Sequence, residues 1–233
     1  MRILAVGAHP DDLEILCGGT LAKYSLAGNI VFMAVLTDGD MGRPDIEPAE
    51  MARIRKSEFE SAAALINAET IWMGVGDEMS EVNLQSRLAM VDVFREARPD
   101  VVLTHSDKDY HVDHRNASAL VFEAAPLACV HNIKRRLPQL DKQPLIYHFD
   151  TIGAINFLPN EYVDITETME IKKRMYLCHE SQDEWMRKAT GFDVCEVIEA
   201  VARVRGYAAG VKYAEGFSRV DAWYRGTTAR VLP

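Results

Sequence analysis

Short runs of consecutive apolar residues alternate along the chain with segments in which apolar residues recur every three or four positions. The short runs, typical of strands buried on both faces of a sheet, are Ile3 to Val6, Ile30 to Leu36, Ile71 to Met73 and Val101 to Leu103. The helical pattern covers Met51 to Ile66, interrupted by Glu58, and Leu84 to Ala97. This order predicts right-handed crossovers and an α/β fold of the Rossmann-like, doubly wound class, with a mostly parallel sheet and helices on both faces.

The alternation weakens after residue 140. Leu145 to Phe149 and Tyr162 to Ile165 have strand patterns, and Thr166 is a plausible N-cap for a helix that ends near Cys178. Asp193 and Glu196 form a capping-box pattern in front of an apolar stripe made by Val194, Val197, Ile198, Val201 and Val204. Because no repeat or linker divides the sequence, we expect a single domain over residues 1–233 with an elaborated C-terminal third.

Composition and charge narrow the class of protein. Hydrophobic residues make up 48% of the 233 residues, which suits an ordinary packed core. The 35 acidic residues against 26 basic ones give a net charge of −9, which disfavours nucleic acid or an anionic membrane as the main partner. The longest apolar stretches fall short of the roughly 20 residues that cross a bilayer, and no cleavable leader pattern follows Met1. We therefore expect a cytoplasmic protein.

The four cysteines, Cys17, Cys129, Cys178 and Cys195, are far apart and form no CxxC pair. This spacing argues against a thiolate zinc site and against a disulfide framework. We expect four reduced thiols that mostly contribute to packing.

Histidines and carboxylates follow the predicted strands. In open α/β sheets, ligands bind beyond the carboxyl ends of the strands. Strand one is followed by Ala8 to Asp12, strand two by Thr37 to Asp40, strand three by Gly74 to Glu78, and strand four by Thr104 to His114. So many carboxylates at one edge would repel one another unless a cation lay among them, so the pattern predicts a metal site.

Three of these residues match the ligand number of a catalytic zinc site, which leaves a fourth position for water. His9, Asp12 and His114 fit that number, and the neighbouring Asp11 is free to act as general base. His111 lies three residues before His114 and could polarise a carbonyl oxygen or protonate a leaving amine, with Asp113 orienting it. Together these groups are suited to amide hydrolysis.

Other polar residues in these segments have simpler explanations. Asp38, Asp40, Asp107 and Asp109, taken singly, are typical of caps and turns, and we interpret His105, His131 and His148 as structural. Gly18 and Gly19 indicate close helix packing, since no GxGxxG or Walker pattern follows the first strand.

The segments Ala8 to Glu14 and His111 to His114 resemble the zinc-dependent N-acetylglucosaminyl deacetylases of the PIG-L or LmbE-like type. Further segments resemble family patterns in the same order, and Tyr213 to Phe217 looks most like the branch that serves bacillithiol biosynthesis. These further segments are Gly18 to Thr20, Thr37 to Gly39, Arg55 to Glu58, Arg98 to Asp100 and His179 to Gln182.

The resemblance implies that His9, Asp12 and His114 bind zinc, that Asp11 activates water, and that His111, tuned by Asp113, stabilises the oxyanion or protonates the amine. It also implies that Arg55 and Asp77 line the substrate pocket, with Arg43 as a rival arginine on the second loop. The sequence departs from the family pattern at Gly76, where a proline-containing turn is common, and at Val112, where proline is usual.

We therefore predict a zinc-dependent hydrolase that removes an acyl group, most simply acetyl, from the amine of an N-acetylglucosamine-type conjugate. One alternative is an amidase acting on a larger thiol-conjugate or other amide. Another is a non-catalytic nucleotide- or sugar-binding module, which the missing glycine fingerprint disfavours. Two histidines and a carboxylate also describe an Fe²⁺ site, but oxygenase chemistry would leave Asp11 and His111 without a role.

Apolar residues outside the regular pattern bear on assembly. Trp185, Tyr207, Trp223 and Tyr224 could pack against the domain or against a partner subunit. The family resemblance implies a homo-oligomer, a trimer or a hexamer.

Overall fold

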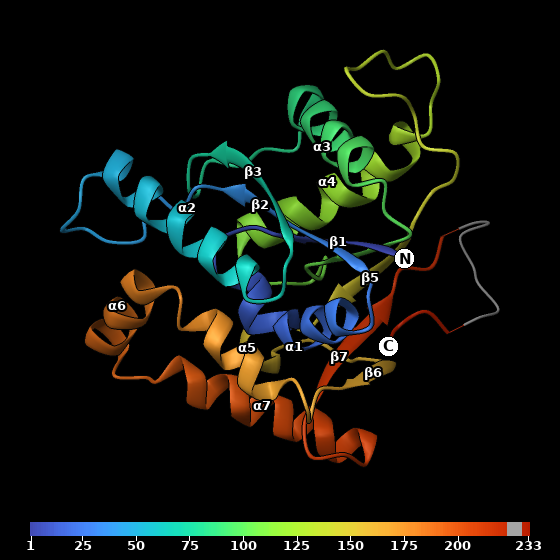
Figure 1. The fold of residues 1–233 in the computed structure, drawn as a ribbon. Coiled ribbons are helices and arrows are strands. Elements are labelled where there is room, and N and C mark those ends of the chain that lie inside the picture. Colours follow the sequence, from blue (N-terminus) through green and yellow to red (C-terminus); the bar gives the residue numbers. More distant parts are fainter. Residues whose placement is uncertain (223–229) are drawn as a thin grey trace.

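One sheet organises the part of the chain that the structure describes, residues 1–222 and 230–233 of a computed structural model. Its strand order is β3-β2-β1-β4-β5-β7-β6 (Figure 1). The strands are β1 (Arg2–Gly7), β2 (Ile30–Thr37), β3 (Glu69–Val75), β4 (Val101–Thr104), β5 (Leu145–Phe149), β6 (Glu161–Asp164) and β7 (Ala214–Arg219). Strands β1 to β5 are parallel, whereas β7 runs antiparallel to both β5 and β6. The predicted doubly wound α/β class is confirmed.

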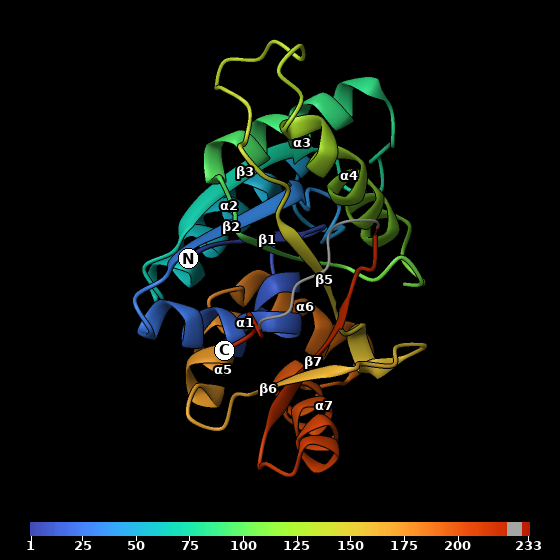
Figure 2. The same ribbon diagram turned by 90° about the vertical axis from the view of Figure 1, so that its right-hand side faces the viewer.

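Helices cover both faces of the sheet, as Figures 1 and 2 show. They are α1 (Asp12–Leu26), α2 (Pro48–Ala64), α3 (Leu84–Ala97), α4 (Val112–Ala128), α5 (Met169–Tyr176), α6 (Glu180–Thr190) and α7 (Val194–Ala209), with a 3₁₀ turn, η1 (Ile152–Ala154). Because side chains alternate along a strand, Ile3 and Ala5 of β1 pack on the core under α1, α2, α5 and α7, whereas Leu4 and Val6 pack on the core under α3 and α4.

Helix α2 differs in detail from the predicted apolar face. Its buried stripe contains Met51, Phe59 and Ala62, as the period requires, but also Arg55, while Leu65 is exposed. The predicted interruption at Glu58 is explained by a contact with α6, because its carboxylate accepts hydrogen bonds from the backbone N–H and the hydroxyl of Ser181. Arg55 is buried because its guanidinium reaches the loop after β1.

The C-terminal third adds β5 to β7 and α5 to α7. The predicted N-cap at Thr166 is wrong, because Thr166 lies in a turn closed by the Asp164 carboxylate and α5 begins only after Thr168. The predicted N-cap at Asp193 is confirmed, and its side chain accepts a hydrogen bond from the backbone N–H of Cys195. Glu215 of β7 joins this third to α1, since it accepts hydrogen bonds from Gly19 and Thr20 and pairs with buried Lys172.

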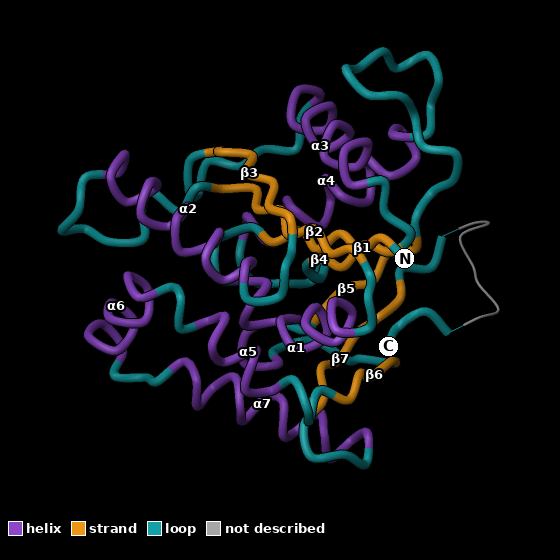
Figure 3. Tube along the Cα trace, viewed as in Figure 1, coloured by secondary structure: helices purple, strands orange, loops and turns teal. Residues whose placement is uncertain are grey.

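The loops at the carboxyl ends of the strands carry the predicted polar segments, and the long loop from α4 to β5 lies at the other end of the sheet. Figure 3 shows the long loop from α4 to β5 near the amino-terminal end of the sheet. The loops after β1, β2, β3 and β4 leave from the opposite edge, because these strands are parallel. The sheet therefore brings the four predicted polar segments to one place.

The four aromatic residues that were expected to bear on assembly are exposed, half-buried or outside the described residues. Tyr207 is 75% exposed and Trp185 is half-buried, while Trp223 and Tyr224 lie outside the described residues. None of the helices in the described ranges has the length and apolar character to cross a bilayer. The assignment of all 233 residues to one domain stays a prediction.

The paired glycines of α1 give a stability prediction. A Cβ atom at Gly19 would lie 2.9 Å from three side-chain atoms of Ile165, whereas at Gly18 the nearest atom would be 3.4 Å away. We expect Gly19→Ala to lower the free energy of unfolding by about 1–3 kcal/mol through overpacking. The matched variant Gly18→Ala should be neutral or gain up to about 1 kcal/mol of helix propensity. Urea unfolding measures both, and equal effects would contradict the close approach of α1 to Ile165.

Candidate metal centre and active site

The Asp12 carboxylate lies at the centre of the polar cluster beyond β1 and β4. It is 2% exposed, and its Oδ2 accepts hydrogen bonds from the backbone N–H groups of His9 at 2.7 Å and Ala8 at 3.0 Å. Burial opposes its charge, but His114, His105 and His9 outweigh burial and hold the pKa of Asp12 well below its ordinary value. Asp12 is therefore a fixed anion facing three imidazole rings.

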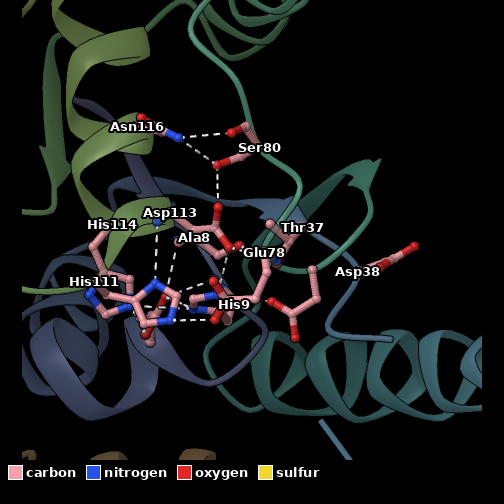
Figure 4. A network of polar contacts seen from close by, with 12 residues as sticks. Ala8, His9, Thr37, Asp38, Glu78, Ser80, His111, Asp113, His114 and Asn116 are labelled. Atoms are coloured by element: carbon pink, nitrogen blue, oxygen red, sulfur yellow. Dashed lines mark hydrogen bonds and ion pairs between the residues drawn. The ribbon is translucent and has the colours of Figure 1, made fainter. Parts of the chain in front are cut away.

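The three predicted ligands meet at nearly equal distances. His9 Nδ1 lies 3.3 Å from Asp12 Oδ2, His114 Nε2 lies 3.3 Å from Asp12 Oδ1, and the same two imidazole nitrogens are 3.3 Å apart. Figure 4 shows the two rings side by side at the end of β1 and the start of α4. Bond lengths of about 2.0–2.1 Å in a tetrahedral zinc site place ligand atoms about 3.3 Å apart. The two imidazole nitrogens thus face different oxygens of the same carboxylate, and two imidazoles with a carboxylate are ligand types that a divalent metal takes.

The same cluster offers other ligand combinations. Asp12 and His114 also group with His105, and His9 and His114 also group with His111, each set within 4.8 Å. His105 is completely buried and its Nε2 accepts a hydrogen bond from Ala8 N–H at 3.0 Å. Burial lowers the pKa of His105 to about 4, and the neutral ring packs against Asp12, with Nε2 lying 3.1 Å from Asp12 Oδ2.

Asp11 occupies the N-cap position of α1, yet its side chain makes no capping hydrogen bond. Its Oδ2 lies instead 3.0 Å from the Arg55 guanidinium, which also donates to the carbonyl of Pro10. The backbone of Asp11 has φ 136°, a value that costs a non-glycine residue of order 1–3 kcal/mol and that persists mainly at functional sites. Burial raises the pKa of Asp11 against the opposing charge of Arg55, which is appropriate for a general base.

His111 and Asp113 both lie at the start of α4, but they do not form the predicted side-chain pair. His111 is the N-cap, its Nδ1 accepts a hydrogen bond from Asp113 N–H, and its Nε2 lies 3.1 Å from Glu78 Oε1. The Asp113 carboxylate lies 3.4 Å from His9 Nε2 and accepts hydrogen bonds from Ser80 and from Glu78 N–H (Figure 4). The carboxylate partner of His111 is therefore Glu78, and Asp113 orients His9.

Hydrogen bonding fixes the charge of Asp113. Burial opposes ionisation, but hydrogen bonds from His9, Ser80 and Glu78 lower the pKa of Asp113 to about 2. Asn116 donates to Ser80, so the chain Asn116, Ser80, Asp113 and His9 is connected without a break (Figure 4). This network holds the His9 ring from the side opposite Asp12.

The residues expected to line the pocket divide into two groups. Asp77 is nearly buried, lies 3.1 Å from His9 Nε2 and lines the cavity, as does Arg55. Arg43 pairs with Asp45 at 2.8 Å and with Glu184 at 3.3 Å and is not among the residues lining the cavity. A substrate contact by Arg43 stays a prediction.

Sequence reasoning missed two residues that support the cluster. Asp109 Oδ2 lies 3.0 Å from His114 Nδ1, and His105 contacts Asp12. Both residues follow β4, but a single Asp in a loop cannot be told from a turn residue in the sequence. Two features together identify them as supporting residues: their position at the carboxyl end of a central strand and their burial. The sequence reveals the position but not the burial.

A cavity of about 490 Å³ opens over the cluster. Its lining includes Asp11, Asp77, Glu78, Tyr110 and His111 together with residues of the C-terminal third, which are apolar except for Tyr176 and Gln182. The arrangement can bind a metal, accept a proton at Asp11 and donate a hydrogen bond from His111.

The fold and this cluster define an α/β protein with a His–Asp centre of metal-binding type at the carboxyl edge of its sheet. Comparison with known proteins then gives the family. Residues 4–125 match the family model PIG-L, described as GlcNAc-PI de-N-acetylase, and the chain belongs to this family.

Similar proteins include deacetylases and a hydratase. The chain is 33% identical over 231 residues to diacetylchitobiose deacetylase of Thermococcus kodakarensis, covering 92% of this chain and 81% of the relative. The structure of N,N'-diacetylchitobiose deacetylase from Pyrococcus horikoshii superposes with a TM-score of 0.81 at 28% identity, covering 94% of this chain and 83% of that chain. The 4-carboxy-2-hydroxymuconate hydratase of Pseudomonas putida superposes with a TM-score of 0.84 at 25% identity, over 99% of this chain and 100% of that chain.

The environment of His114 gives a titration prediction for the metal-free protein. Burial opposes its charge, but Asp12 and Asp109 raise the pKa of His114 to about 9. A raised pKa stabilises the fold fully below the ordinary value of about 6.5, and this contribution is lost as the pH rises through about 9. NMR titration of metal-free protein should therefore show His114 protonated at neutral pH.

Substitution of the partner tests the cause. Asp109→Asn should lower the pKa of His114, whereas Asp107→Asn, whose side chain is 68% exposed and faces His148, should leave it unchanged. A pKa of His114 near 6.5 in the unsubstituted protein would contradict the described contacts.

Proposed function

We propose that this chain is a metal-dependent N-deacetylase that hydrolyses the acetamide of an N-acetylglucosamine-type conjugate, with zinc as the metal. The carrying observation is the carboxylate of Asp11, which makes no capping hydrogen bond and lies next to a cluster in which the side chains of His9, Asp12 and His114 approach one another to 3.3 Å. The family and the deacetylase relatives support the same reaction class.

Each group of the site has a task in amide hydrolysis. A bound divalent metal supplies Lewis acidity toward water and the amide carbonyl. His9, Asp12 and His114 hold the metal, while Asp113, Asp109 and His105 fix the orientation of these ligands. Asp11 accepts the proton of the attacking water, and Arg55 keeps the Asp11 carboxylate turned away from the helix N-terminus.

His111 completes the reaction from the opposite side. Its Nε2 lies beside Glu78 and His111 lines the cavity, where Nε2 can donate a hydrogen bond to the developing oxyanion. The proton that Asp11 accepts from water is then available to the departing amine. The product is an amine that becomes cationic in water. Asp77 and Glu78 line this side and favour an ammonium group over an anion.

The charges that line the cavity also favour the substrate of a deacetylase over that of a hydratase. The hydratase relative takes, by its name, a carboxylated substrate. In this chain the described cavity is lined by four carboxylates, whereas its lining arginine, Arg55, is already paired with Asp11. A neutral amide fits such a cavity better than a polyanion does.

A larger amide is the alternative substrate, and we propose a cytoplasmic homo-oligomer as the working form. One experiment separates the two substrates. Protein purified without added metal is analysed for metal content, and amine release from N-acetylglucosamine conjugates is followed before and after chelation. We expect one zinc per chain and amine release that chelation abolishes and zinc restores. Bound metal without release would favour another amide, and failure to bind zinc would contradict the proposal.

Substitution of the base tests the assignment of Asp11. Asp11→Asn should reduce amine release about 10²–10⁴-fold, because the base is lost, while the zinc content stays unchanged. Asp38→Asn, which follows β2 and does not line the cavity, is the matched control and should retain activity. Full activity of Asp11→Asn would show that another group takes the proton.

A further inference from the structure

Seven of the twenty residues that line the cavity have apolar side chains, and the proposed chemistry does not use them. We define the apolar wall as Ile15, Ile152, Ile155, Met186, Phe192 and Val197, all of which line the cavity. They come from α1, η1 and the residue after it, α6, the α6–α7 connection and α7. Ile15 lies one helical turn after Asp11, so the wall begins beside the proposed base and extends outward.

The backbone that carries the wall is anchored. Arg205 of α7 pairs with the Asp150 carboxylate at 2.6 Å and donates to the carbonyl of Phe157, so it clamps both ends of the 150–157 segment. The non-glycine residues Ala154 and Asn156, on either side of Ile155, have φ of 59° and 57°. Such conformations persist where the surrounding structure imposes them. Ile155 is therefore presented by a fixed, strained turn.

Exposure differs among the apolar residues that line the cavity. Val194 is 8% exposed, whereas Ile155 is 54% and Phe192 is 64% exposed. Large apolar side chains at the mouth of a polar catalytic site stay in contact with water unless a ligand covers them. The outer part of the cavity is thus suited to an apolar group of the substrate.

We propose that the conjugate carries an apolar aglycone, an aryl or alkyl group attached to the amino sugar, and that the apolar wall binds it. This inference rests on the proposed function. A hexosamine bears hydroxyl groups on most carbons, which find partners on the side of Asp77, Glu78, Tyr110 and His111 and none on the wall. The wall therefore contacts another part of the substrate.

The position of the wall favours the aglycone over a long acyl chain. The acyl carbon must lie at the metal centre, where Asp11 and the ligands are, so a short acetyl group stays at the buried end of the cavity. The most exposed wall residues, Ile155 and Phe192, lie at the rim, where the part of the substrate farthest from the scissile bond emerges.

The test compares the methyl and phenyl glycosides of N-acetylglucosamine as substrates of the zinc-loaded enzyme. We expect kcat/KM to be at least about tenfold higher for the phenyl glycoside, mainly through KM, because an apolar ring leaves water. Phe192→Ala should reduce this preference at least about fivefold. Tyr207→Ala, an aromatic residue that is 75% exposed on α7 and does not line the cavity, is the matched control.

A second pair of variants addresses the 150–157 segment. Ile155→Ser should weaken the phenyl preference, whereas Leu158→Ser, 90% exposed and outside the lining, should not. Equal kcat/KM for the two glycosides would overturn the inference and leave the proposed function intact. Absence of amine release from both glycosides would overturn the proposed function itself.

Two further results would also overturn the inference. One is a preference that follows acyl length in N-acetyl and N-hexanoyl substrates instead of the aglycone. The other is a change of sedimentation with Phe192→Ala without a change in substrate preference, which would show that the wall is covered by a second copy of the chain.

Discussion

The buried carboxylate of Asp12 is the constraint on which the site depends. It receives two backbone N–H groups from the loop after β1 and faces imidazoles from the loop after β4 and from α4. Such an anion is tolerable in a buried position only with this many donors. The same contacts that satisfy Asp12 join β1 to β4, so the central strands of the sheet and the metal centre are stabilised together.

The turn after β1 has to satisfy several demands within four residues. His9 and Asp12 must point at one spot, Asp11 must point elsewhere, and α1 must begin at once. The positive φ at Asp11 is the local cost of this arrangement. Arg55, on a helix that is distant in sequence, compensates by pairing with the Asp11 carboxylate that no longer caps α1. This explains why Arg55, a charged residue, lies in the buried apolar stripe of α2.

The limits of prediction from sequence follow from the same contacts. The antiparallel strand β7 and helix α6 were not predicted. Strands β1 to β6, helices α2, α3 and α7, and the gathering of His9, Asp12 and His114 were predictable from periodicity and the parallel topology. The pairing of His111 with Glu78, in place of Asp113, was not, because Glu78 arrives from the loop after β3 and its approach depends on three-dimensional packing. Asp109 and His105 were missed for the same reason, since burial turned ordinary loop residues into partners of the ligands. The boundary error at Thr166 was local and arose from a competing turn at Asp164.

Chemistry and selectivity come from different parts of the chain. The family match covers residues 4–125, which contain all the proposed ligands, the base and His111, whereas the apolar wall, apart from Ile15, comes from residues 152–197. A hydratase and deacetylases share the overall fold with this chain, so the fold alone does not determine the substrate. Under the proposed function, the metal-binding residues at the carboxyl ends of the strands supply activated water, and the residues that line the cavity from the C-terminal third select what the water attacks. Glu215 with Lys172 joins β7 to α5, and Glu58 with Ser181 joins α2 to α6, so the C-terminal third is attached to the rest of the fold by contacts that involve none of the proposed ligands.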